Sequence, residues 1–470
     1  MPQSYPDDVA ADDKIPTSRL ARSTRVGRLA ASQAARQAGT RAANAFRGED
    51  ARREALARRQ LETAEQVVAA LGTMKGAAMK LGQVLSFLDI GLVPQEYREQ
   101  FQAKLAALRD AAPKVSFKDM RRVLEQEYGE RLGDVFADFE EDPIASASIG
   151  QVYRARLDDG RDVAVKVQYP GVANAVRADM QNMGMILRLL RSIAPGLDPK
   201  AMGEEIRARI EEELDYELEA QNQRTLARIF RDHPFIVVPD VMTSLSHERV
   251  IVTEFVDGRG FEELKQLPQA QRDRIGEMIF RFYFGCMYRH LQFSGDPHPG
   301  NSLLLPDGRM AFLDFGLFKR IRPDIAEFEL QTQRLGIERR GEELITHLHR
   351  GGLIRDPSKY TPEGALQQFD DFTWWYTRDE EVELTPEIAT QVTIEMSDPR
   401  SSYFGQMRHE TLPPDHLLGR RLETLVLAVL GQLHSTGNWH RIAREWIYDD
   451  PPVTDLGREE AAFYDRPAAA

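Results

Sequence analysis

The chain has 470 residues, more than one hydrophobic core usually supports, so we expect two lobes or domains. Its 42% hydrophobic and 29% charged residues are ordinary for a globular protein, and its single cysteine excludes a disulfide framework or a thiolate zinc site. The net charge of −13 argues against nucleic-acid binding by the main fold. No run of 18 apolar residues is present, so we expect no transmembrane segment.

The N-terminal part of the chain is basic. Residues 14–59 contain twelve Lys or Arg and three Asp or Glu. Two interpretations are open: a solvated, flexible tail, or a basic amphipathic helix that contacts an anionic membrane surface. We therefore separate residues 1–59 as a basic segment, and expect a cytoplasmic protein with peripheral contact at the inner membrane face.

A helical extension is predicted next, over residues 60–115. Between residues 62 and 88 apolar residues recur at steps of three and four, which indicates a helix with one buried stripe. Lys80 and Gln83 share a different face of that helix. Further helices are predicted over residues 93–113 and 117–129.

The stretch 145–167, ASASIGQVYRARLDDGRDVAVKV, predicts a β-hairpin that turns at Asp159-Gly160. It matches the order of a kinase phosphate loop, G-x-G-x-x-G-x-V, followed by a strand carrying V-A-I-K. Lys166 would then hold the α- and β-phosphates of a nucleotide. The alternative is an ordinary hairpin with one exposed lysine. The candidate nucleotide-binding loop consists of Ala145, Ser146, Ala147, Ser148, Ile149, Gly150 and Val152.

Helices are predicted from about residue 172 to 229, and two strands follow, in FIVVPDVM and ERVIVTEFVDG. A kinase lysine needs a carboxylate partner on a helix. The candidates are Glu213, Asp215 and Glu219, and their sequence spacing alone does not show which of them pairs with Lys166. The second strand has the character of a connection between lobes. Backbone groups from Glu254 to Val256 would receive an adenine edge there.

The stretch 291–321, LQFSGDPHPGNSLLLPDGRMAFLDFGLFKRI, carries three candidate catalytic residues. Asp296 and Asn301 have the five-residue spacing of a kinase catalytic loop, and Asp314 begins a D-F-G after a predicted hairpin. Mg²⁺ prefers oxygen ligands, which Asn301 and Asp314 would supply. Asp296 would orient or deprotonate the attacking hydroxyl or water. A chance D-F-G is easy to find, but the ordered set of motifs is not.

Five segments together resemble the UbiB family of atypical kinases, also called AarF or ADCK proteins: MKLGQVLS, ASASIGQVYRA, VAVKVQYPG, EELDYELEAQN and GDPHPGN with LDFG. The resemblance covers roughly residues 60–330. It implies an α+β, bilobal protein-kinase-like fold with an N-terminal helical extension packed over the active site. The expected divisions are the extension at 60–115, an N-lobe at 116–257, a C-lobe at 258–440 and a tail at 441–470.

The resemblance also assigns roles by position. Lys166 matches the nucleotide lysine, Glu219 its helix partner, Asp296 the catalytic aspartate, and Asn301 and Asp314 the metal ligands. The family's regulatory extension matches at Lys80, Gly82 and Gln83, which face an E-x-D pair at Glu213 and Asp215. One departure is the loop, which reads Ala-Ser-Ala-Ser where the family's fuller form is Ala-Ala-Ala-Ser.

The implied function is a MgATP-binding kinase or ATPase that supports isoprenoid quinone biosynthesis or membrane lipid homeostasis, with a lipid or quinone precursor as a further ligand. Two alternatives remain. One is a nucleotide-binding scaffold without turnover, which has no need of all four residues Lys166, Asp296, Asn301 and Asp314. The other is a Ser/Thr protein kinase, which the extension and the lack of a clear A-P-E segment disfavour.

Overall fold

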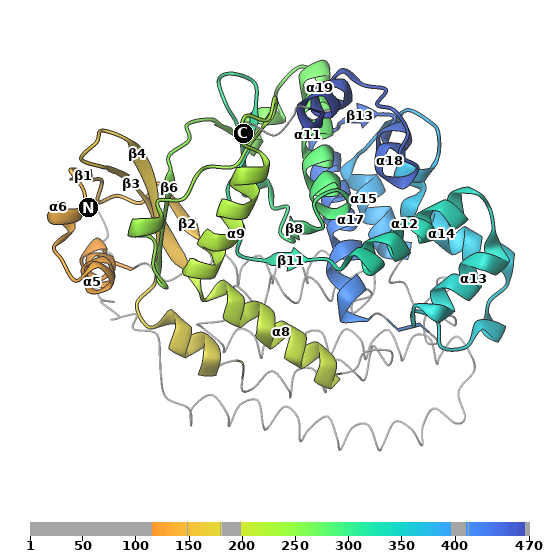
Figure 1. Cartoon of the computed structure of the whole chain (residues 1–470), viewed down its shortest axis with the longest axis horizontal. Helices are drawn as coiled ribbons and strands as arrows, with labels where there is room; N and C mark the ends of the chain where they lie inside the picture. Colours follow the sequence, from red (N-terminus) through yellow and green to blue (C-terminus); the bar gives the residue numbers. More distant parts are fainter. Residues whose placement is uncertain are drawn as a thin grey trace, which may run out of the picture.

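The computed structural model describes residues 115–147, 149–178, 180, 199–395, 410–411 and 413–465. The predictions for the basic segment and for Lys80, Gly82, Gln83 and Ser148 lie outside these ranges. Within them the chain is an α+β structure with two lobes, a sheet-containing N-lobe at one end and a helical C-lobe at the other (Figure 1).

An antiparallel sheet forms the N-lobe. Its strands lie in the order β1-β3-β4-β6, and β2 also pairs with β3. The pairing of β3 with β4 runs from Gly150 opposite Gln168 to Arg156 opposite Asp162, which confirms the predicted hairpin. The strands are β1 (Asp138–Phe139), β2 (Ala145–Ala147), β3 (Gly150–Arg156), β4 (Asp162–Gln168) and β6 (Val250–Glu254).

One face of this sheet is covered by α5 (Phe117–Tyr128), which is followed by the short α6 (Leu132–Val135). Ser116 caps α5 by accepting a hydrogen bond from the Asp119 N–H. Alternate residues of β4, Val163, Val165 and Val167, are fully buried in the N-lobe core, as strand alternation requires. The residues between them therefore face the opposite side of the sheet.

The predicted long helical stretch is divided in the described residues. Helix α8 (Pro199–Glu213) ends before Leu214, and α9 (Tyr216–Ile229) begins after Asp215. Asp215 Oδ1 accepts hydrogen bonds from the N–H groups of the second and third residues of α9, so it is the N-cap. Helix α9 belongs to both cores, because Tyr216 and Ala220 are in the N-lobe core and Leu226 and Phe230 are in the C-lobe core.

Short strands line the C-lobe side of the interface between the lobes. One sheet has the order β5-β10-β9-β7, and β8 pairs with β11. The antiparallel pairing of β9 with β10 confirms the predicted hairpin at Asp307-Gly308. Only two residues of FIVVPDVM are in a strand, because Pro239 cannot donate a ladder hydrogen bond. The bounds are β5 (Ile236–Val237), β7 (Arg259–Gly260), β8 (Gln292–Ser294), β9 (Ser302–Leu304), β10 (Met310–Phe312) and β11 (Phe318–Arg320).

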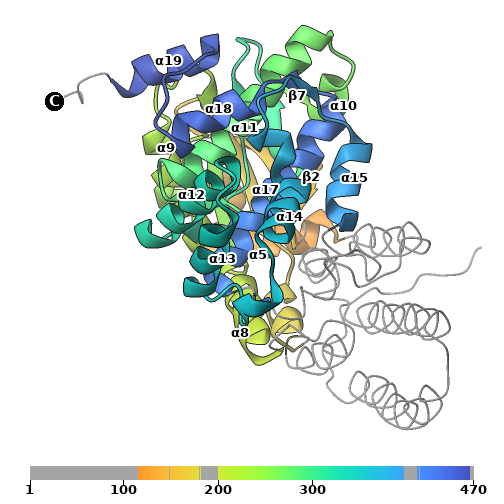
Figure 2. The same ribbon diagram turned by 90° about the vertical axis from the view of Figure 1, so that its right-hand side faces the viewer.

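Helices form the rest of the C-lobe, with α17 packed against α11 and α15 in its centre (Figure 2). They are α10 (Phe261–Leu264), α11 (Gln269–Tyr288), α12 (Pro323–Ile337), α13 (Gly341–Arg350), α14 (Pro362–Thr377), α15 (Pro386–Glu395), α17 (Pro414–Leu433), α18 (Trp439–Ile447) and α19 (Asp455–Tyr464). Two short strands, β12 (Val382–Glu383) and β13 (Thr436–Gly437), pair beside them.

The segment expected to be a tail from residue 441 is packed into the C-lobe. Trp439 and Ile442 of α18 and Leu456 of α19 are buried in the C-lobe core. Beneath them Arg281 of α11 is fully buried among carboxylates from α11, α18 and α19. The expected boundary at residue 440 therefore falls inside α18.

Candidate nucleotide-binding and catalytic site

Lys166 lies at the centre of the site. It is on β4, on the face opposite the buried valines, and its Nζ is 2.7 Å from Glu219 Oε1 of α9. Asp314 Oδ2 lies 3.5 Å from the same nitrogen. The structure thus selects Glu219 from the three carboxylates that the sequence left open, and joins β4, α9 and the D-F-G loop at one ammonium group.

The electrostatics keep Lys166 charged. Burial lowers the pKa of its ammonium, but the carboxylates of Asp314 and Glu219 outweigh this effect and raise the pKa well above its ordinary value. Glu219 is only 2% exposed, so the ion pair is shielded from water on that side. A permanently charged amine at this position suits a group that binds phosphate rather than one that exchanges protons.

The D-F-G loop follows β10. Phe315 is fully buried in the C-lobe core, which fixes the loop to the lobe. The Gly316 N–H donates to Asp314 Oδ1 at 3.0 Å, so one carboxylate oxygen is held by the backbone while the other faces Lys166. The orientation of the Asp314 carboxylate is therefore set by two independent contacts.

The loop that carries Asp296 and Asn301 lies beside the D-F-G loop. Asn301 Nδ2 donates to the Asp296 carbonyl at 3.3 Å, and the Leu313 N–H donates to the Asn301 carbonyl at 2.9 Å. Asn301 ends the short helix η2 (Pro299–Asn301), whose cap is His298. The amide nitrogen of Asn301 is thus used within the loop, which would let its amide oxygen act as a ligand.

The candidate phosphate loop is the turn between β2 and β3. Ala145, Ser146 and Ala147 pair with Val152, Gln151 and Gly150 in turn. The Ile149 carbonyl accepts from the Tyr169 N–H at 2.8 Å, so the return of the loop is tied to the end of β4. A Cβ atom at Gly150 would lie 2.1 Å from the Val167 carbonyl oxygen, so the close approach of β3 and β4 here requires glycine.

The candidate adenine-binding segment connects the lobes after β6. The exposed Glu254 turns its carboxylate to the Asp240 N–H, at 3.0 Å, so its side chain is used locally. The N–H groups of Glu254 and Phe255 donate to the carbonyls of Asp240 and Asp162. Among the described residues the N–H of Val256 forms no backbone hydrogen bond. An adenine base would therefore contact the backbone of this segment rather than the Glu254 side chain.

The E-x-D pair lies at the junction of α8 and α9. Glu213 is buried at the end of α8, and Asp215 is the α9 cap. The predicted partner of the pair, Lys80, lies outside the described residues, as do Gly82 and Gln83. The contact between the extension and this pair stays a prediction.

Sequence reasoning missed two residues that the fold brings to the site. Tyr216 lies with its ring centroid 5.0 Å from Lys166 Nζ, and it is three positions before Glu219 on α9, a helical spacing that offered a signal. Arg421 of α17 donates from Nη1 to the Gly295 carbonyl at 3.2 Å, directly before Asp296. Burial lowers the pKa of Arg421 to about 9. No local pattern indicates this contact, because 126 residues separate its partners.

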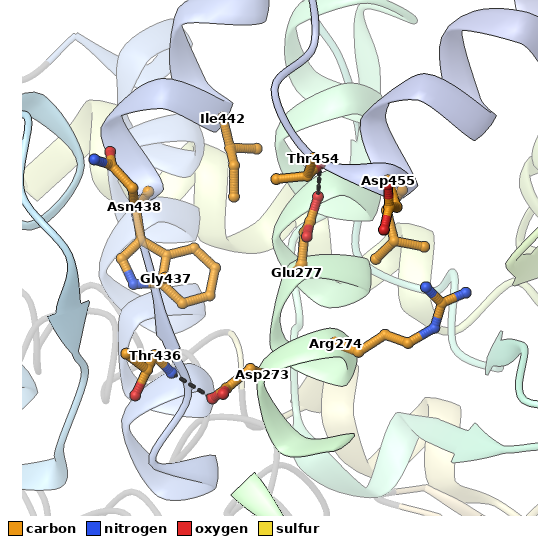
Figure 3. Close-up of a pocket in the computed structure, with 11 residues that line it drawn as sticks. Asp273, Arg274, Glu277, Thr436, Gly437, Asn438, Ile442, Thr454 and Asp455 are labelled. Atoms are coloured by element: carbon orange, nitrogen blue, oxygen red, sulfur yellow. Dashed lines mark hydrogen bonds between the residues drawn. The ribbon is translucent and has the colours of Figure 1, made fainter. Parts of the chain in front are cut away.

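A separate pocket of about 260 Å³ lies in the C-lobe (Figure 3). Asp273 and Glu277 of α11, Thr436 and Asn438 before α18, and Thr454 before α19 are among the residues that line it. Asp273 accepts from the Thr436 N–H at 2.7 Å, and Thr454 is hydrogen-bonded to Glu277. These contacts join α11 to the C-terminal segments, and none of the residues named for nucleotide binding lines this pocket.

Comparison with known proteins identifies the family of this fold. The model of the ABC1 atypical kinase-like domain matches residues 107–332. A solved structure of Rv3197 of Mycobacterium tuberculosis, in complex with erythromycin, is 33% identical to this chain, with a TM-score of 0.60 over 84% of this chain and 98% of that one. The chain belongs to the UbiB/AarF/ADCK family of atypical kinases. The predicted α+β kinase-like fold is thereby confirmed.

Curated UbiB/AarF/ADCK proteins are also similar to this chain. Rat "Atypical kinase COQ8B, mitochondrial" is 31% identical over 333 residues, which are 70% of this chain and 62% of the rat protein. Xenopus tropicalis "AarF domain-containing protein kinase 1" is 31% identical over 56% of this chain and 54% of its own length. The chain thus spans less than two thirds of the length of each of these two relatives. In the described ranges no helix has the length and apolar composition needed to cross a bilayer.

Proposed function

We propose that the chain is a MgATP-binding atypical kinase or ATPase. The observation that carries the proposal is the convergence of Lys166, Glu219 and Asp314, at 2.7 and 3.5 Å, beside the loop that holds Asn301. A cation paired with a buried carboxylate, next to an aspartate and an amide oxygen, is the donor set for a metal-bound polyphosphate. The candidate phosphate loop, in which position 150 has room only for glycine, lies on the N-lobe side of the site.

The residues fit Mg²⁺ only together with a nucleotide. Among the described residues, no group of three or more His, Cys, Asp or Glu side chains is placed to hold a metal ion. Asn301 and Asp314 offer two ligand side chains, and Mg²⁺ is commonly held by one or two carboxylates plus substrate phosphates. We therefore expect metal binding to depend on the nucleotide.

The roles of the residues follow from their positions. Lys166 holds the phosphates, and Glu219 keeps its ammonium in place. Asn301 and Asp314 would hold the metal ion, which would supply positive charge to neutralise the transferring phosphate. Asp296 orients the attacking hydroxyl or water and accepts its proton.

The biological role that we propose is support of isoprenoid quinone biosynthesis or membrane lipid homeostasis, rather than phosphorylation of proteins in trans. Support comes from family membership and from relatives named as mitochondrial and chloroplastic kinases. A lipid or quinone precursor would be the further ligand.

The test is Mg²⁺-dependent ATP hydrolysis by the full chain, with and without anionic liposomes, beside Asp314→Asn. Turnover that requires Asp314 and rises with liposomes would support a membrane-responsive ATPase. Nucleotide binding without turnover in either condition would favour the scaffold instead. Rapid transfer of the γ-phosphate to unrelated proteins would favour a Ser/Thr protein kinase.

Membrane contact through residues 14–59 is part of the proposal, with the body of the protein in the cytoplasm. Twelve Lys or Arg residues in this segment would be attracted to anionic lipid headgroups. Binding to anionic vesicles should therefore weaken as salt is added. Equal vesicle binding by a variant lacking residues 1–59 would exclude the segment as the contact.

A further inference from the structure

Tyr216 occupies a position between the candidate phosphate loop and the ion pair. It is the first residue of α9, and its N–H donates to the Glu248 carbonyl at 2.9 Å. Its side chain is 1% exposed, and its ring centroid is 5.0 Å from Lys166 Nζ. The residue is therefore fixed at its backbone and packed under the lysine that would hold phosphate.

The hydroxyl of Tyr216 lies against the loop. A Cβ atom at Gly150 would be 3.1 Å from the Tyr216 hydroxyl oxygen, so this oxygen lies beside the third glycine position of the kinase pattern. Burial raises the pKa of the phenol, and the charges of Lys166, Glu219 and Asp314 all act on it. The group therefore stays protonated and is a hydrogen-bond donor at neutral pH.

Among the described residues, this donor has no acceptor. The Tyr216 hydroxyl is buried, and among the described residues it has no hydrogen-bond partner. Buried hydroxyls almost always have one, because leaving a buried donor unpaired is unfavourable. The Tyr216 hydroxyl lies between the candidate phosphate loop and the Lys166 ammonium. An unpaired donor in this position is expected to bind an anionic ligand.

We propose that the Tyr216 hydroxyl donates a hydrogen bond to a phosphate oxygen of the bound nucleotide, between Lys166 and the loop at Gly150. The inference rests on the proposed function, because it requires that a nucleotide binds here. It adds a ligand-binding role to a residue that the kinase template does not include. The ring holds the position, and the hydroxyl makes the contact.

The test is Tyr216→Phe, which removes the hydroxyl and keeps the ring. We expect affinity for MgATP and MgADP to fall about tenfold or more, and tenfold is the lower end of the range for a hydrogen bond to a charged group. Affinity for adenosine, which has no phosphate, should not change. The melting temperature of the nucleotide-free protein should stay the same or rise, because the variant loses a buried group that had no partner.

Tyr128→Phe is the matched control. The Tyr128 hydroxyl, also in the N-lobe, donates to the Leu245 carbonyl at 3.1 Å. We expect this variant to have a lower melting temperature and unchanged affinity for MgATP, the reverse of the pattern for Tyr216→Phe. Titration calorimetry with ATP, ADP and adenosine, together with thermal denaturation, measures both properties.

Three results would overturn the inference. Equal affinity of Tyr216→Phe and the unaltered chain for MgATP would remove the hydroxyl from the site. An equal loss for adenosine would mean that the variant alters the pocket rather than a phosphate contact. A lower melting temperature without nucleotide would mean that the hydroxyl has a structural partner. If the unaltered chain binds no MgATP, the proposed function itself fails, and this result is distinct from the other three.

Discussion

Among the described residues, the shorter of the two ionic contacts of Lys166 is with Glu219, at 2.7 Å. Its geometry places both groups at the boundary between β4 and α9. Asp314 is a second partner of Lys166, but it is farther away and would be shared with the metal ion. Glu219 is thus the partner that stays with the lysine when a nucleotide arrives.

Glu219→Gln keeps the shape of the side chain and removes its charge. We expect kcat/KM for ATP hydrolysis to fall about tenfold or more, because a charge-assisted hydrogen bond to Lys166 is lost. Steady-state hydrolysis assays measure this. The control is Glu217→Gln, an exposed residue in the same turn of α9, which should leave kcat/KM unchanged. A similar loss of kcat/KM in both variants would mean that the substitutions act by disturbing α9 rather than by removing the ion pair with Lys166.

At the scale of elements, the two C-terminal helices are joined to α11 by one buried cation. Arg281 contacts Glu277 and Glu445 at 2.7 Å and Glu460 at 2.9 Å. Burial raises the pKa of Glu460, but His233 and Arg281 outweigh it, and the pKa is lower than its ordinary value. The Arg281 guanidinium thus offsets the negative charge of three buried or partly buried carboxylates.

Arg281→Met should therefore lower the free energy of unfolding by about 3–5 kcal/mol, the range for removing one partner of a buried ion pair. Urea denaturation measures it. Arg274→Met is the control on the same helix, because Arg274 is exposed and only 4.0 Å from Glu459. It should change the free energy by less than about 1 kcal/mol.

The loss in Arg281→Met should also depend on pH. With Arg281 in place, the lowered pKa of Glu460 contributes stability at neutral pH that is lost as the pH falls through that pKa. In the variant Glu460 would lose the Arg281 charge that lowers its pKa, so burial would raise that pKa, and protonating Glu460 would relieve the unpaired charge. The deficit should thus shrink as the pH is lowered from 7 towards 5, and a deficit that grows instead would contradict this account.

Features that depend on residues close together in the sequence could be predicted, whereas features that depend on distant residues could not. The hairpin at Asp159-Gly160 and the helix at 117–129 depend on neighbours in sequence, and the structure confirms both. The choice of Glu219, the contact of Arg421 and the burial of α18 and α19 depend on residues far apart in the chain. Periodicity cannot determine which distant surface an amphipathic helix will cover.

On the scale of the whole molecule, the two lobes have separate hydrophobic cores, and the candidate site draws on both. Lys166 and Gly150 come from the N-lobe, while Asn301 and Asp314 come from the C-lobe. A nucleotide held by all four would connect the lobes. It would therefore stabilise the molecule as a whole rather than one lobe.

MgATP at 100 times its Kd should raise the free energy of unfolding by about 2.7 kcal/mol, because the ligand binds only the folded chain. Thermal denaturation followed by circular dichroism would show this as a higher melting temperature. The rise should be smaller for Asp314→Asn and for ATP with EDTA. An equal rise without Mg²⁺ would contradict the inferred role of Asn301 and Asp314.

Helix α9 has a consequence for how long a nucleotide stays bound. Its first turn is buried in one core and its last turn in the other, and a helix of 14 residues has a fixed length of about 21 Å. The lobes can rotate about α9, but they cannot separate along it unless one end leaves its core. We therefore expect nucleotide entry and release to depend on rotation of the lobes about α9, because separation along the helix would require one end to leave its core.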